Sequence, residues 1–301
     1  MRLVVALGGN ALLRRGEKPD AAIQQEHVAE AAPALARLAR EHEMVLVHGN
    51  GPQVGMLALE SAADTSLTRP YPFNDLVAET QGVIGYWLQQ GLANAGLTTP
   101  VVTLVTQTLV AADDPAFEDP SKFVGSVYEE SRARELAEAG GWVVKRDGAG
   151  WRRVVASPRP SGIVEVEIAR SLLEQGTTVV LGGGGGVPVI RTPAGLVGVE
   201  AVVDKDHVAA FVAETLRADA LVMLTDVSAV QADFGTSEAR ALHRVSVADL
   251  AALDLPDGSM GPKVEAACDF VTRTGGRAAI GSLQDAAEVV AGSAGTQVGA
   301  R

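Results

Sequence analysis

The feature that most constrains the fold is a run of five glycines, Gly182–Gly186, that directly follows the apolar, β-branched segment 177–181. An apolar run stopped by glycine is typical of a buried strand that opens into a loop. Glycine adopts positive φ angles without steric cost, and its N–H groups can surround an anion. About twenty residues later, Asp204-Lys205-Asp206 stands before the helical pattern His207–Leu216. Together these segments indicate a site for a phosphorylated ligand, whereas the glycine run alone could equally be a tight corner in a buried sheet.

Two more apolar strands are followed by glycine loops. The strand Leu3–Leu7 precedes Gly8-Gly9-Asn10, and the strand Val45–Val47 precedes His48-Gly49-Asn50-Gly51-Pro52. Segments with helical spacing separate the strands at 21–40 (where we expect Pro33 to kink or break the helix), 53–61 and 80–95, and a further strand is expected at 101–110. This alternation predicts an α/β fold, namely a three-layer αβα sandwich around a mainly parallel sheet. Ligands of such sheets bind at the carboxyl ends of the strands, where all three glycine loops lie.

The segment 120–160 interrupts the alternation. A helical pattern at 127–139 precedes two strand-like runs, 142–145 and 151–155, that flank the turn signal Asp147-Gly148. Such runs predict a β-hairpin. We therefore predict one domain over residues 1–301, made of the halves 1–181 and 182–301, with a small protruding subdomain at about 120–160.

The last third of the chain returns to alternating strands and helices. We expect a strand at Ala220–Leu224, a helix capped at Ser246 and an edge strand at Thr296–Val298. Lys263 falls in or just before the first turn of another helix. A cation is unfavourable at that end of a helix unless an anion lies close by. The position of Lys263 therefore makes a solvated surface lysine the weaker interpretation.

Composition excludes several classes of partner. The net charge of −12 makes nucleic acid and anionic membranes poor partners, and no apolar run has the length of a membrane span. Apolar residues at 47% and a single cysteine, Cys268, fit a globular protein of a reducing compartment, so we expect a cytoplasmic location. The five histidines lack metal-ligand spacing, so we expect no metal held directly by the protein. We expect His48 to bond the backbone of its own glycine loop.

A set of motifs resembles the carbamate kinases, a branch of the amino-acid kinase superfamily. In chain order the motifs are L-G-G-N-A-L, H-G-N-G-P-Q-V-G, Q-G-V-I-G-Y, G-G-G-G-G-V-P-V, V-D-K-D, L-T-D-V and G-S-M-G-P-K-V-E-A-A. The resemblance runs from Arg2 to about Val298. H-G-N-G-P-Q-V-G together with G-S-M-G-P-K is specific to the carbamate branch, and Asn10 fits it because several relatives in the superfamily carry lysine there.

This resemblance implies reversible phosphoryl transfer between ATP and carbamate with Mg²⁺ and ATP or ADP, a role in arginine metabolism, and a homodimer. It implies that the N-terminal half binds carbamate or carbamoyl phosphate and the C-terminal half the nucleotide. The substrate loops would be Gly8, Gly9, Asn10, Gly49, Asn50 and Gly51. The catalytic residues would be the lysines Lys122, Lys205 and Lys263 and the orienting acids Asp204 and Asp206. The nucleotide would meet Gly183, Gly184, Lys205, Thr225, Asp226, Val227, Met260, Gly261 and Lys263.

Some questions stay open at this point. The sequence does not decide whether Asp204 or Asp206 is the main organiser of the lysines. The family usually has proline after the subdomain lysine, where this chain has Phe123, and we expect that change to loosen the start of the subdomain. Segment 253–257 also departs from the family pattern. Two alternatives remain: a superfamily kinase for another small carboxylate or phosphate, and a non-catalytic ligand-binding protein on the same fold.

Overall fold

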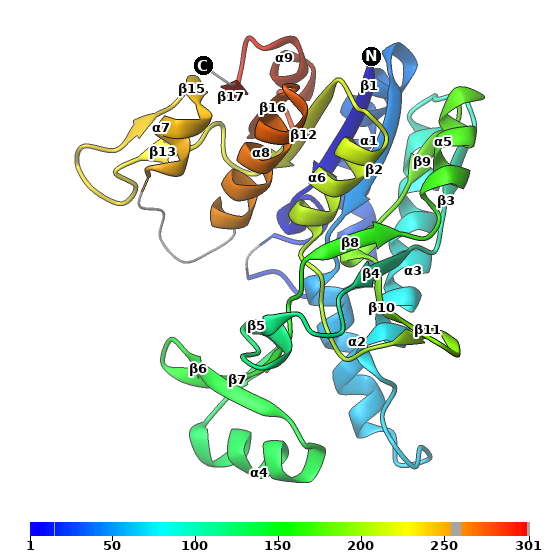
Figure 1. Cartoon of the computed structure of the whole chain (residues 1–301), viewed down its shortest axis with the longest axis vertical. Helices are drawn as coiled ribbons and strands as arrows, with labels where there is room; N and C mark the ends of the chain where they lie inside the picture. The colour runs from blue at the N-terminus through cyan, green and yellow to red at the C-terminus, as the bar shows by residue number, and fades with distance from the viewer. Residues whose placement is uncertain (15, 254–259, 300–301) are drawn as a thin grey trace.

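The fold is built on a central sheet, shown in Figure 1 for the computed structural model. Among the described residues, which are 1–14, 16–253 and 260–299 without the side chain of Asn10, this sheet has eight strands in the order β15-β17-β16-β12-β1-β2-β9-β3. They are β1 (Arg2–Leu7), β2 (Glu43–His48), β3 (Val101–Thr103), β9 (Thr178–Val180), β12 (Ala220–Thr225), β15 (Arg244–Ser246), β16 (Arg277–Ser282) and β17 (Thr296–Gly299). Neighbouring strands from β16 to β3 are parallel, and β17 is antiparallel to β16. The prediction of a mainly parallel sheet is confirmed.

Helices cover both faces of the sheet because its inner strands are apolar on both sides. In β1, Leu3, Val5 and Leu7 belong to the same core as α1 (Ala21–Glu41), α3 (Phe73–Asn94) and α9 (Ala286–Ala291). The alternate residues Val4 and Ala6 belong to the core that contains α5 (Val166–Glu174), α6 (Lys205–Thr215) and α8 (Met260–Thr274). Side chains alternate between the faces of a strand, so the sheet lies between two helical layers. The three-layer αβα sandwich is confirmed.

A subdomain protrudes from this body at the lower left of Figure 1. It consists of β5 (Lys122–Tyr128), α4 (Glu130–Gly140), β6 (Val143–Asp147) and β7 (Gly150–Val155), with strand order β5-β7-β6. The hairpin predicted around Asp147-Gly148 is confirmed by the pairing of β6 with β7. The helix predicted to begin at Val127 begins at Glu130 instead, because residues up to Tyr128 pair with β7.

The remaining elements are shorter. A second sheet contains β11 (Gly195–Gly198), β10 (Val187–Thr192), β4 (Gln107–Val110) and β8 (Pro160–Ile163), and a small one contains β13 (Gln231–Ala232) and β14 (Arg240–Ala241). Two more α-helices are α2 (Gly51–Ala63) and α7 (Val247–Ala251), and the 3₁₀ turns are η1 (Gly9–Ala11), η2 (Pro115–Phe117) and η3 (Gly183–Gly185). Ser246 caps α7 as predicted. None of the described helices combines the length and apolarity that a membrane crossing requires.

Several expected boundaries were wrong. The helix α1 continues through Pro33, and α3 begins at Phe73 rather than Thr80. The strand expected at 101–110 is divided into β3 and β4. Between them the Gln81 amide accepts from the N–H of Thr106 and donates to its carbonyl, which also accepts from the N–H of Val187. The expected edge strand β17 is not at the edge, since β15 pairs along its outer side.

Candidate active site

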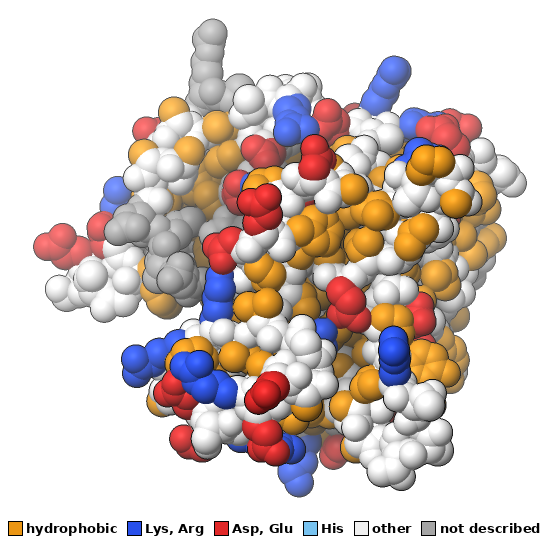
Figure 2. Space-filling model, turned by 60° about the horizontal axis from the view of Figure 1, so that its bottom comes forward, with side chains coloured by type: hydrophobic (Ala, Val, Ile, Leu, Met, Phe, Trp, Pro, Cys, Tyr) orange, Lys and Arg blue, Asp and Glu red, His pale blue; other side chains and the backbone are white. Residues whose placement is uncertain are grey.

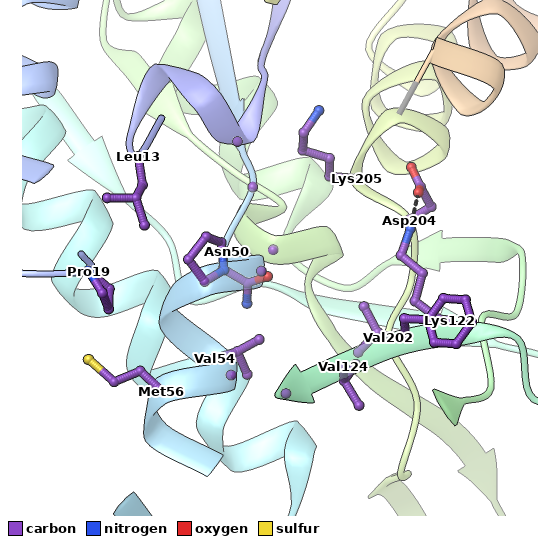
Figure 3. A pocket seen from close by; sticks show the side chains of 18 of the residues that line it. Leu13, Pro19, Asn50, Val54, Met56, Lys122, Val124, Val202, Asp204 and Lys205 are labelled. Atoms are coloured by element: carbon purple, nitrogen blue, oxygen red, sulfur yellow. Dashed lines mark hydrogen bonds and ion pairs between the residues drawn. The ribbon is translucent and has the colours of Figure 1, made fainter. Parts of the chain in front are cut away.

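One pocket gathers residues that are far apart in the sequence. Its volume is about 790 Å³, and its lining comes from all three glycine loops, β5 and the first turns of α2, α6 and α8. In Figure 3, Lys122 and Asp204 face each other, Lys205 lies beside them, and Asn50 occupies the middle of the lining. The predicted site residues that line it are Gly9, Gly49, Asn50, Gly51, Lys122, Gly184, Asp204, Lys205, Asp206 and Lys263.

Two acids at the start of α6 orient the three lysines. Asp206 accepts from the Nζ of Lys205 at 2.6 Å and from the Nζ of Lys263 at 3.1 Å. Asp204 accepts from the Nζ of Lys122 at 2.6 Å, and its other oxygen accepts from the backbone N–H of Asp206 at 2.8 Å, which caps α6. Asp206 therefore organises the two lysines of the main body, and Asp204 joins the subdomain to the start of α6. The anion that the position of Lys263 at a helix start requires is the carboxylate of Asp206.

The lysine–aspartate contacts differ in how far their side chains are buried. The side chains of Asp206 and Lys263 are each 5% exposed, whereas that of Lys122 is 39% exposed. Burial alone would raise the pKa of Asp206, but Lys205 and Lys263 outweigh it and lower that pKa. Burial would also raise the pKa of Asp204, and Lys122 with the capping N–H lowers it instead. Both acids are therefore carboxylates at neutral pH. Burial and the charge of Lys205 lower the pKa of Lys263, an effect that Asp206 opposes.

The glycine run brings three backbone segments into close contact. Gly182, Gly184, Gly185 and Gly186 have φ angles from 65° to 90°, a region that only glycine adopts freely. A Cβ at Gly185 would overlap the carbonyl oxygen of Val203, the residue that precedes Asp204. A Cβ at Gly184 would overlap the amide of Asn50. The run therefore sets the position of α6 against the second glycine loop, and its role in binding an anion stays a prediction.

His48 is a structural residue of the second glycine loop, as predicted. Its side chain is fully buried, and its Nδ1 lies 2.9 Å from the carbonyl oxygen of Gly49, to which it donates. Burial lowers the pKa of His48 from 6.5 to about 4, so the imidazole is neutral at physiological pH. Its Nε2 faces Gly183 and has no hydrogen-bond partner among the described residues. His48 does not line the pocket.

Most residues expected to bind the nucleotide lie beyond this lining. Thr225 ends β12 next to the first glycine loop, since a Cβ on Gly8 would lie 3.3 Å from its Oγ1, and this hydroxyl donates to Asp226. Val227 follows them and is partly exposed. Met260 and Gly261 begin α8, while Gly258 and Ser259 of the same motif lie outside the described residues. Nucleotide binding by these residues and by Gly183 stays a prediction, as does substrate binding by Gly8 and by Asn10, of which only the backbone is described, in η1.

Asp204 and Asp206 both accept hydrogen bonds from nitrogen donors. Within residues 1–14, 16–253 and 260–299, no group of three or more His, Cys, Asp or Glu side chains is arranged to hold a metal ion. Each oxygen of Asp204 and Asp206 accepts a hydrogen bond from a lysine or from the backbone. The two acids therefore hold the three lysines and the start of α6 in place.

The sequence did not predict the contacts that join the subdomain to the main body. They centre on Arg153, and we call them the Arg153 clamp. The guanidinium carbon of Arg153, on β7, lies 4.6 Å from the ring centroid of Trp142 and 4.9 Å from that of Phe73. Arg153 also donates to Glu200 at 3.0 Å. Phe73 and Glu200 belong to the main body, so these contacts join the subdomain to it. No motif marks Arg153, because its partners are distant in the sequence.

Comparison with known proteins agrees with this geometry. The model of the amino acid kinase family matches residues 1–282. The carbamate kinase of Escherichia coli (strain K12) is 50% identical over 294 residues, which cover 98% of each chain. The carbamate kinase of Rhizobium meliloti (strain 1021) is 48% identical over 303 residues, covering 98% of this chain and 92% of that one. The solved structure of the carbamate kinase from Giardia lamblia bound to AMP-PNP has a TM-score of 0.92 at 37% identity, covering 99% of this chain and 98% of that one.

The α/β fold and the match to the family model over residues 1–282 define the class of protein: the chain belongs to the amino acid kinase family. Within that family, the relatives and the solved structure described above are all carbamate kinases. The resemblance inferred from the motifs is therefore confirmed, as is the enzyme class that it implied, an ATP-dependent kinase.

Proposed function

We propose that the protein transfers a phosphoryl group reversibly between ATP and carbamate, with ADP and carbamoyl phosphate as the other pair of substrates. The observation that carries this proposal is the convergence of Lys122, Lys205 and Lys263 on one pocket, each oriented by an aspartate. During transfer, two anions approach in line and charge spreads over the equatorial oxygens of the phosphoryl group. Preorganised ammonium groups stabilise such charge well. The carbamate kinase names of the relatives support the same acceptor.

The chemistry requires no general base. Carbamate is already an anionic nucleophile, so nothing has to remove a proton from it before it attacks. His48, the histidine next to the second glycine loop, is neutral, fully buried and outside the pocket lining. Catalysis then consists of positioning and charge stabilisation.

The roles of the individual residues follow from their places around the pocket. Backbone N–H groups of the first two glycine loops would hold carbamate and the phosphoryl group, and the ends of β12 and α8 would hold the nucleoside. Mg²⁺ would enter as part of the ATP or ADP complex. Carbamate released by the reverse reaction breaks down to ammonia and CO₂.

We propose that the subdomain is a lid that carries Lys122. Lys122 is the first residue of β5, at the base of the subdomain, and is half-exposed. A lysine on a closing element would reach the acyl phosphate only in the closed state, and closure would exclude water that could hydrolyse it. Deleting the segment 142–155 should therefore raise the ratio of hydrolysis to transfer.

We further propose a cytoplasmic homodimer that serves arginine metabolism. Large apolar side chains are exposed on α3, α5 and β11, at Val83, Tyr86, Ile168, Leu196 and Val197. Figure 1 places these elements along one side of the molecule, and Figure 2 shows hydrophobic side chains gathered on that side. An exposed apolar area of this kind favours association. Light scattering should give twice the mass of one chain, and Tyr86→Glu with Ile168→Glu should halve it.

The decisive experiment measures ATP formation from ADP and carbamoyl phosphate by the purified protein. A panel of other acyl and phosphoryl donors is run alongside it. Carbamoyl phosphate should be the best donor. A better rate with another donor would make the protein a kinase for a different acceptor, and no ATP with any donor would make it a non-catalytic binding protein.

A further inference from the structure

The second glycine loop contains one buried polar side chain whose orientation is fixed from outside the loop. Asn50 is 5% exposed and lines the pocket. Its Nδ2 lies 2.9 Å from the Oγ1 of Thr80, a fully buried residue of α3. The Oγ1 of Thr80 lies 2.8 Å from the carbonyl oxygen of Val77. These contacts form a short chain from the helix to the pocket.

The direction of this chain follows from which groups can donate. The carbonyl of Val77 can only accept, so Thr80 uses its single proton on it. The Oγ1 of Thr80 is then left as an acceptor, and Asn50 must turn its NH₂ group toward it. The Oδ1 of Asn50 consequently points away from Thr80. Gly184 leaves room for this arrangement, because a Cβ there would overlap the amide.

The pocket is rich in donors but offers few free acceptors. Its lysines and glycine N–H groups suit the phosphoryl and carboxylate oxygens of the substrates. Asp204 and Asp206 accept from lysines, and Glu17, another lining acid, uses one oxygen, Oε2, for both the backbone N–H of Arg14 and His27. The amino group of carbamate, however, needs an acceptor. On the glycine-loop side of the pocket, the Oδ1 of Asn50 is available for it, and Figure 3 shows this amide between Lys205 and Val54.

We propose that Thr80 is a positioning residue that holds the Oδ1 of Asn50 as the acceptor for the amino group of carbamate and carbamoyl phosphate. This inference rests on the proposed function. It makes the site selective for an acyl phosphate that carries an NH₂ group over one that carries a methyl group of similar size. An unpaired buried acceptor is costly, so the methyl compound leaves Oδ1 unsatisfied and binds less well.

The test compares carbamoyl phosphate with acetyl phosphate as phosphoryl donors to ADP. Thr80→Val keeps the shape of the side chain and removes the hydroxyl, so the Asn50 amide is free to turn. It should lower kcat/KM for carbamoyl phosphate about tenfold and leave that for acetyl phosphate within about twofold. Thr80→Ser, the matched control, keeps the hydroxyl and should retain the parent selectivity. Equal losses with both donors, or unchanged selectivity in Thr80→Val, would overturn the proposal.

A second variant covers the case in which Thr80→Val does not fold. Replacing both hydrogen-bond partners by apolar groups of similar shape leaves no buried donor unpaired. The double variant Thr80→Val with Asn50→Leu should therefore fold and lose the preference for carbamoyl phosphate, while a retained preference contradicts the role of Oδ1. If the parent protein itself makes no ATP from carbamoyl phosphate, the proposed function fails. If it does and its selectivity ignores Thr80, only this inference fails.

Discussion

The pocket contains two sets of lysine–aspartate pairs with similar distances and different surroundings. The buried triad consists of Lys205, Asp206 and Lys263, and the outer pair consists of Lys122 and Asp204. The triad lies between α6 and α8 in the body, whereas Lys122 is on the subdomain and is half-exposed. Breaking a buried pair leaves an uncompensated charge. In the outer pair Asp204 is also largely buried, but it keeps a hydrogen bond from the N–H of Asp206, and Lys122 is half-exposed. The triad should therefore matter to both folding and catalysis, and the outer lysine mainly to catalysis.

Asp206→Asn should have the largest effect, because it removes the partner of both buried lysines at once. We expect the free energy of unfolding to fall by about 3–5 kcal/mol and turnover to fall by more than ~10². Urea unfolding and steady-state kinetics measure the two effects. Asp204→Asn is the matched control and should cost less, because Asn can still cap α6 and the lysine it leaves unpaired, Lys122, is half-exposed. Equal stability losses in the two variants would remove the distinction between triad and outer pair.

Lys205→Ala separates the catalytic role of the triad from its structural role. Asp206 keeps Lys263 as its partner in this variant, so the fold should survive. Turnover should drop about 10² or more, the loss that follows removal of one preorganised donor. Lys145→Ala serves as the control, since Lys145 is also paired with an acid at 2.6 Å but outside the pocket lining. If Lys205→Ala retains turnover within about twofold of the parent, Lys205 has no part in the mechanism.

Lys122→Ala tests the outer pair. Turnover should fall ~10- to 100-fold because a transition-state contact is lost. The stability loss should be smaller than in Asp206→Asn, because Asp204 keeps the N–H of Asp206 as a donor. The affinity for ADP should be nearly unchanged, since the nucleotide is assigned to the other half. Calorimetry with ADP and the coupled kinetic assay give both quantities. Weakened ADP binding with intact transfer would instead assign Lys122 to the nucleotide.

The sequence predicted well the elements that a pattern of neighbouring residues marks. Apolar runs such as Leu3–Leu7 and Val45–Val47 became buried strands, and the glycine run adopted the positive φ angles that only glycine tolerates freely. The position of Lys263 at a helix start implied a nearby anion, and the carboxylate of Asp206 is one, but the sequence did not say which group would supply it. Choosing between Asp204 and Asp206 needed the rotation of α6, which directs neighbouring side chains to different partners.

Contacts that join distant segments gave no sequence signal. Thr80 and Asn50 are thirty residues apart, and Thr80 was expected merely to begin a helix that in fact starts at Phe73. The Arg153 clamp depends on the docking of the subdomain, which no local pattern encodes. Likewise, β17 looked like an edge strand because its partner β15 is only three residues long and lies far earlier in the chain.

The last prediction concerns the pH dependence of stability, because the buried side of the site contains the titratable side chain of His48. Its pKa is 6.5 ordinarily and about 4 in the fold. Between these values the unfolded chain binds more protons than the folded one, so stability falls as the pH falls through this window. The loss from His48 should be about 1 kcal/mol at pH 5.5 and about 3 kcal/mol near pH 4, relative to pH 8. Urea unfolding from pH 8 to pH 4 measures it, with His48→Gln as the control. Other groups titrate in the same range. The comparison is therefore between the slopes of the free energy of unfolding against pH for the parent and for His48→Gln. The parent should lose stability more steeply than His48→Gln below pH 6.5. Parallel curves would show instead that His48 accepts a proton in the folded protein, and that this side of the site is more accessible to water than its burial indicates.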